Sequence, residues 1–126
     1  MEFKMKEGGF TADFPFGELH ISGDESYGFR PYQLLVSSVA VCSGGVLRKI
    51  FAKQRIDIDD ITIQTDVLRN PDEADRIEKI SIHFMIKGTG LKEEKVRKAL
   101  ELTRKNCSMV QSVIPAIEIE ETFELK

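Results

Sequence analysis

The stretch "LLVSSVAVCSGGVLRKI", Leu34 to Ile50, decides the fold class, because it is a long apolar segment with a cysteine near its centre. It belongs to a run of seventeen uncharged residues, 31–47, which contains three serines and two glycines. A helix that spans a bilayer needs about 20 predominantly apolar residues, so this run is short of that length. Pro31 suits the first turn of a helix, and the basic residues after the run favour a helix carboxyl end. The stretch predicts a buried helix of a soluble protein over residues 31–54.

The first four turns of this helix lack a polar face, so we expect a sheet and a partner helix to cover it on nearly all sides. Ser38, Cys42 and Gly45 share one stripe at helical spacing, and therefore the cysteine faces a region of small side chains. Such a stripe allows either close contact with another helix or space for a ligand. The pattern leaves both possibilities open.

On both sides of the helix the apolar residues alternate with polar ones, as they do in strands. Three short alternating runs lie within residues 1–22, separated by Gly8-Gly9 and by 15–17, and they predict a three-stranded meander. Downstream, residues 61–67 and 80–86 alternate on either side of the turn signal "NPDEAD". These two runs predict a long hairpin.

Beyond the hairpin, Val96, Leu100, Thr103 and Cys107 share one stripe of an amphipathic segment, which predicts a second helix that ends near Cys107. The letters "SMVQSV" predict a further short helix, capped by Asn106 or Cys107, and "AIEIEETFEL" predicts a last strand. Taken in order, these segments predict an α+β fold in a single domain over residues 1–126.

The charges exclude several function classes. The chain has 18 basic and 21 acidic residues, interspersed, with a net charge of −3, so it offers no basic stripe for nucleic acid and no polybasic membrane patch. The amino terminus "MEFKMKEGGF" lacks the apolar core of a secretory signal, and we therefore expect a cytoplasmic protein. In that compartment cysteines are normally free thiols, and a disulfide is usually transient and catalytic.

Two weaker patterns, a possible metal site and a possible dinucleotide-binding turn, do not meet the requirements of either site. Cys42, Cys107, His20 and His83 contain no closely spaced pair of ligands, so no metal site is expected, and each histidine alternates with apolar neighbours as a structural strand residue does. The segment "KGTGLKEEKV" has two glycines between a strand and a helix but lacks the third glycine of a dinucleotide-binding turn. An ordinary strand-to-helix turn is the better interpretation.

The two cysteines allow two interpretations. Free cysteine is among the most buried residue types and fills cores as a small hydrophobe. Against this, Cys107 lies where one helix ends and another begins, and amide groups at a helix start stabilise a thiolate. These observations leave both core filling and chemistry open, and they do not pair the cysteines.

A resemblance to a known family suggests how they pair. The helix entered by "RPYQLL" and carrying "SSVAVCSGG", the long hairpin, and a helix that ends in a second cysteine resemble the OsmC and organic hydroperoxide resistance family over essentially the whole chain. The resemblance implies antiparallel sheets wrapped around central helices in an intertwined homodimer. It also implies that Cys42 is a peroxidatic cysteine and Cys107 its resolving partner, with no metal, haem or flavin.

Two positions depart from the family pattern. Members with strong peroxidase activity carry an acidic residue ten positions before the first cysteine, where this chain has Tyr32, and an arginine in the amino-terminal sheet, whereas no arginine precedes Arg30 here. Arg30 is the candidate replacement. We therefore expect a slow or specialised thiol reaction in oxidative stress, with an organic hydroperoxide as substrate, an apolar pocket beside Cys42 to bind it, and an external dithiol as reductant. The alternative is a non-catalytic dimer that binds a small hydrophobic molecule and keeps both cysteines buried.

Overall fold

The computed structural model describes all 126 residues, and they form two compact units, residues 1–37 and residues 38–126. The long helix α1, Pro31–Lys53, begins in the first unit and continues through the second. Its bounds agree with the predicted helix to within one residue. By length and composition alone α1 could cross a membrane, but core helices of soluble proteins meet the same criterion.

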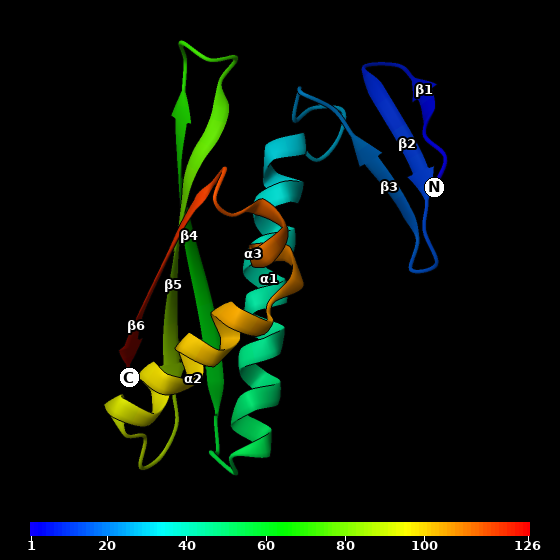
Figure 1. The fold of residues 1–126 in the computed structure, drawn as a ribbon. Coiled ribbons are helices and arrows are strands. Elements are labelled where there is room, and N and C mark those ends of the chain that lie inside the picture. The colour runs from blue at the N-terminus through cyan, green and yellow to red at the C-terminus, as the bar shows by residue number, and fades with distance from the viewer. The chain divides into compact units, whose positions relative to one another are not determined.

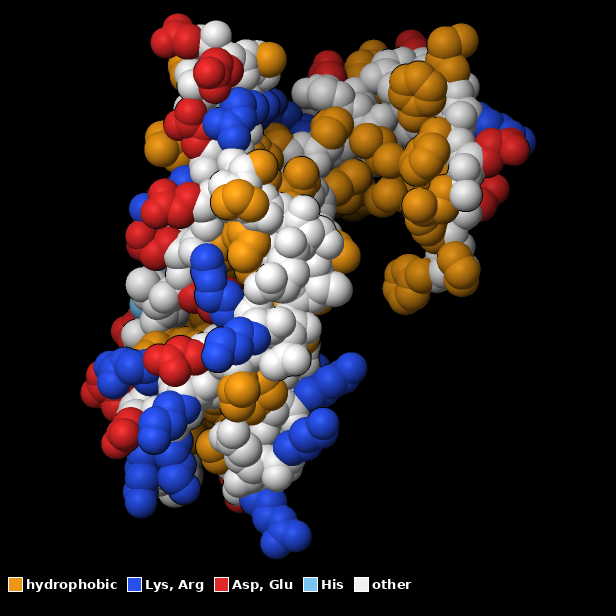
Figure 2. All heavy atoms as spheres, in the orientation of Figure 1, with side chains coloured by type: hydrophobic (Ala, Val, Ile, Leu, Met, Phe, Trp, Pro, Cys, Tyr) orange, Lys and Arg blue, Asp and Glu red, His pale blue; other side chains and the backbone are white.

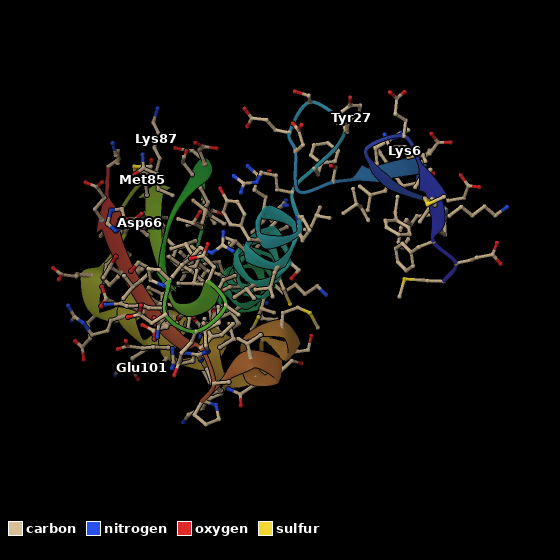
Figure 3. The ribbon with its side chains drawn as sticks, turned by 90° about the horizontal axis from the view of Figure 1, so that it is seen from above. Lys6, Tyr27, Asp66, Met85, Lys87 and Glu101 are labelled. Carbon is tan, nitrogen blue, oxygen red and sulfur yellow. The ribbon has the colours of Figure 1, made fainter.

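The first unit contains the predicted three-stranded antiparallel meander, drawn in blue in Figure 1. Gly8 lies in the first turn with a φ of 76°, and a side chain there would collide with the ring of Tyr27. Lys6 Nζ donates a hydrogen bond to the Tyr27 carbonyl at 2.6 Å and lies 2.7 Å from His20 Nδ1, so it ties the first strand to the loop before α1 (Figure 3). The strands are β1 (Lys4–Lys6), β2 (Gly9–Asp13) and β3 (Glu18–Ile21).

The second unit contains a sheet in the order β4-β5-β6 (Figure 1). Strands β4 (Asp60–Asn70) and β5 (Arg76–Lys87) form the predicted antiparallel hairpin. The last strand, β6 (Glu118–Leu125), pairs with β5 in parallel, so this sheet is mixed and not antiparallel throughout as the resemblance implied. Helices α2 (Glu93–Asn106) and α3 (Ser108–Val113) make the connection between these two parallel strands, and both were predicted from the sequence.

The core of the second unit is built on the inner face of β5. Its four alternating apolar side chains are fully buried, as are Leu47 and Phe51 of α1. On the outer face, His83 contacts β6, with Nδ1 2.7 Å from Thr122 Oγ1 and Nε2 3.2 Å from a carboxylate oxygen of Glu124. The structural interpretation of His83 fits these contacts. The buried residues of β5 are Ile80, Ile82, Phe84 and Ile86.

One prediction about α1 is not met within a single chain. Val39 and Leu47 are buried, but Ser38, Val41 and Gly45 share an exposed stripe on another face of the helix. The Val41 side chain is 67% exposed, which is high for a valine in the middle of an apolar helix. The chain therefore covers one side of α1 and leaves another open.

Candidate functional site

The fold brings the two cysteines together although 64 residues separate them in the chain. Cys42 lies on α1, and Cys107 is the single residue between α2 and α3. The Cys107 thiol donates a hydrogen bond to the sulfur of Cys42, and no disulfide joins them. Cys42 is partly exposed, whereas Cys107 is completely buried. A reagent from solvent therefore reaches Cys42 more easily than Cys107.

The position of Cys107 follows from a break in the backbone between α2 and α3. Its extended conformation, with φ −81° and ψ 109°, ends α2, and its N–H donates to the Thr103 carbonyl at 2.8 Å. Its own carbonyl accepts a hydrogen bond from the Gln111 N–H at 3.0 Å and so begins α3. Neither Asn106 nor Cys107 caps α3 through its side chain. The first N–H groups of a helix have no partner within it, and here they lie beside the sulfurs.

Cys42 is the more acidic of the two thiols. A hydrogen bond from the backbone N–H of Met109 is the largest cause that lowers its pKa, and burial opposes it. The Cys107 thiol and Ser108, through both its hydroxyl and its N–H, lower the pKa further. The Ser108 Oγ lies 3.8 Å from the Cys42 Sγ. Donors from the start of α3 therefore lie beside the Cys42 sulfur.

Amides at the helix start favour the Cys107 thiolate, as the sequence indicated, but the net shift of the Cys107 pKa is upward. Burial raises the pKa of Cys107, and a charge on Cys42 raises it further. Backbone N–H groups of Val110 and Met109 act in the opposite direction, but burial outweighs them. Cys42 therefore loses its proton at a lower pH than Cys107 does.

Close to Cys42 along the chain, α1 packs closely on β4. A Cβ at Gly44 would lie 2.6 Å from Ile63 Cδ1, so a larger residue there would require the Ile63 side chain to move. A hollow of about 170 Å³ lies on this face, between α1 and β4. Cys42 does not line it, so this hollow is not the apolar pocket expected beside the cysteine. Its lining residues are Val41, Gly44, Gly45, Arg48, Ile61 and Ile63.

Arg30 belongs to the first unit, and the cysteine pair belongs to the second. The guanidinium carbon of Arg30 lies 4.9 Å from the centre of the Tyr32 ring, a cation–π contact. Its backbone N–H donates to Gln33 Oε1 at 3.2 Å. A role for Arg30 at Cys42 remains a prediction.

Sequence reasoning missed Ser108 and Met109, which supply donors to Cys42. It expected a short helix there but assigned no role to its first residues. The available signal was the pair of adjoining helices with one cysteine between them, because such a break frees several amides at once. What the sequence did not indicate is that these amides face a sulfur on a different helix.

Comparisons with known proteins agree with the resemblance seen in the sequence. Residues 23–122 match the family model described as OsmC-like protein. Protein YhfA of Escherichia coli strain K12 is 26% identical over 105 residues, which cover 82% of this chain and 77% of YhfA.

Solved structures resemble the whole chain. A hypothetical protein from Aquifex aeolicus VF5 is 26% identical, with a TM-score of 0.88 over 99% of this chain and 93% of its own. An organic hydroperoxide resistance protein OsmC from Legionella pneumophila is 14% identical, with a TM-score of 0.74 over 98% of this chain and 93% of its own. At 14% identity the second likeness concerns the fold alone.

Proposed function

This chain belongs to the OsmC-like family, and from that premise we propose that it is a thiol peroxidase that reduces organic hydroperoxides, with Cys42 as the peroxidatic and Cys107 as the resolving cysteine. One observation carries the proposal. The two thiols share a hydrogen bond, and their pKa values are shifted in opposite directions. The class of substrate is proposed from the family, which this chain shares, and the organic hydroperoxide resistance protein from Legionella pneumophila has the same fold.

In the first step, the Cys42 thiolate attacks the outer oxygen of the hydroperoxide. A bond forms between sulfur and that oxygen, the O–O bond breaks, and an alkoxide leaves with the electron pair and takes up a proton. The products are an alcohol and a sulfenic acid on Cys42. The donors beside Cys42 lower the pKa of its thiol, and burial protects Cys107 from the same oxidation.

In the second step, Cys107 attacks the oxidised sulfur of Cys42, and the sulfenic oxygen leaves as water. The pKa of Cys107 supports this order of events, because burial and, to a lesser extent, the charge on Cys42 raise it. Oxidation removes that charge, and Cys107 then loses its proton more readily. An external dithiol reduces the resulting disulfide, and we propose that the cycle runs in the reducing cytoplasm.

Treatment with cumene hydroperoxide is expected to convert the reduced chain into a form lighter by two hydrogen atoms in intact mass. A non-reducing gel should show no covalent dimer, because Cys42 and Cys107 already contact each other within one chain. Retention of both free thiols in excess hydroperoxide would argue against the peroxidase and for the alternative, a binding protein with structural cysteines.

We further propose that the chain forms a homodimer. Each unit leaves apolar surface open. In the second unit it is the Val41 side chain on α1. In the first unit it is a set of aromatic side chains on and beside the meander, where Figure 2 shows hydrophobic side chains gathered. Apolar surface gathered in this way is typical of protein interfaces. The aromatic residues that are at least 40% exposed are Phe3, Phe10, Phe16, Tyr27 and Phe29.

Light scattering at low micromolar concentration is expected to give twice the chain mass of 14.3 kDa. The physical reason is the hydrophobic gain from burying the Val41 side chain and the aromatic side chains, at about 25 cal/mol per Å² of apolar surface. A monodisperse species with the mass of one chain would contradict the proposed dimer.

A further inference from the structure

We propose that Ser108 is a catalytic residue whose hydroxyl donates a hydrogen bond to the alkoxide that leaves when Cys42 is oxidised. This inference rests on the proposed function, because it assigns a donor to the hydroperoxide reaction. Residues 1–29 contain no arginine, so the amino-terminal sheet supplies no guanidinium group to contact the reacting atoms. Ser108 would supply a hydrogen-bond donor in its place.

Ser108 and Cys107 contact the Cys42 sulfur from different environments. The Ser108 Oγ lies 3.8 Å from the Cys42 Sγ, although the two residues are far apart in sequence. Ser108 is exposed to solvent, whereas Cys107 is completely buried. A hydroperoxide that arrives from solvent therefore meets the serine hydroxyl beside the sulfur, while Cys107 contacts the same sulfur from the interior.

The local backbone fixes Ser108 in this position. It is the first residue of α3, and its carbonyl accepts a hydrogen bond from the Ser112 hydroxyl at 2.6 Å. The preceding residue, Cys107, is bonded to both adjoining helices through its backbone. The backbone of Ser108 is thus held near Cys42 by hydrogen bonds on both sides, and a donor on a fixed backbone loses less free energy in reorienting during the reaction.

The chemistry favours a donor to the leaving oxygen over a donor to the sulfur. In the reaction, negative charge moves from the sulfur, where it is diffuse, to one oxygen of the alkoxide, where it is concentrated. A hydrogen bond to a charged oxygen is shorter and stronger than one to sulfur. A hydrogen bond accelerates the reaction only to the extent that it is stronger in the transition state than in the ground state. The bond from Ser108 would strengthen in this way as negative charge develops on the leaving oxygen.

The test compares two reactions of Cys42 in the Ser108→Ala variant, at a pH on the plateau where Cys42 is fully ionised. Alkylation by iodoacetamide releases iodide, so it needs no donor to an oxygen. We expect Ser108→Ala to be alkylated at Cys42 at least as fast as the wild type, since a thiolate that loses a donor becomes more nucleophilic. With cumene hydroperoxide the same variant should react about tenfold more slowly.

Two control variants accompany the test. Ser108→Thr keeps a hydroxyl and should restore most of the oxidation rate, whereas Ser81→Ala, on the outer face of β5, should change neither reaction. An oxidation rate of Ser108→Ala equal to that of the wild type would overturn the proposal. Equal slowing of both reactions would also overturn it, because that result indicates a displaced Cys42. A wild type that hydroperoxide does not oxidise would instead contradict the proposed function itself.

Discussion

Replacing Cys42 by serine is expected to lower the rate of cumene hydroperoxide consumption, measured with dithiothreitol as reductant, by about 100-fold or more. The remaining thiol, Cys107, is buried and has a raised pKa. An ordinary thiol with a pKa near 8.5 is about 3% ionised at pH 7, and Cys107 lies below that fraction. Because its side chain is completely buried, hydroperoxide also reaches it less easily than it reaches Cys42.

The control for this substitution is a measurement that the Cys42→Ser variant still folds. Cys42 is partly exposed, so serine is expected to leave the circular dichroism spectrum and the thermal unfolding midpoint close to those of the wild type. A Cys42→Ser protein that folds normally and consumes hydroperoxide at the wild-type rate would contradict the assignment of Cys42 as the reacting residue.

Replacing Cys107 by serine is expected to leave the first oxidation within severalfold of the wild-type rate but to block formation of the disulfide. The serine hydroxyl can still donate to the Cys42 sulfur, so the Cys42 pKa should remain low. In excess hydroperoxide the sulfenic acid then oxidises further, because nothing resolves it. Intact mass should rise by one, two and then three oxygen atoms, whereas the wild type should lose two hydrogens.

Continued turnover of Cys107→Ser with a dithiol at the wild-type rate would contradict the resolving role. In that event the reductant would attack the sulfenic acid directly, and Cys107 would serve only as a hydrogen-bond donor to Cys42. The mass spectrum separates the two cases, since direct attack by the reductant prevents the gain of a second and third oxygen.

Most of the fold could be predicted because its periods are local. The uncharged segment before Arg48 predicts a helix, and the strict alternation over 80–86 predicts a strand. Neither prediction requires knowledge of the tertiary contacts. The parallel pairing of β6 with β5 could not be predicted, because it depends on how α2 and α3 carry the chain back across the sheet. The apolar pattern predicted that α1 needs cover on nearly all sides, but it does not say which of its residues stay exposed in one chain, as Val41 does.

In the candidate site, too, some features could be predicted from the sequence and others depend on the fold. The resemblance identified Cys42 and Cys107, and the structure brings their sulfurs into contact. The sign of the Cys107 pKa shift was not predictable, because it results from a balance between burial and helix amides that only the fold determines. The contact of Ser108 with Cys42 joins two helices that no sequence period connects.

The assignment of the two cysteine roles is tested most directly by stopped-flow oxidation of the two single variants with cumene hydroperoxide, measured side by side as loss of the one remaining thiol. We expect Cys107→Ser to be oxidised at a rate close to that of the wild type and to give a dimedone adduct on Cys42, and we expect Cys42→Ser to react more slowly than an ordinary exposed thiol. Wild-type oxidation of Cys42→Ser, together with an unreactive Cys107→Ser, would reverse the two roles and contradict the proposed mechanism.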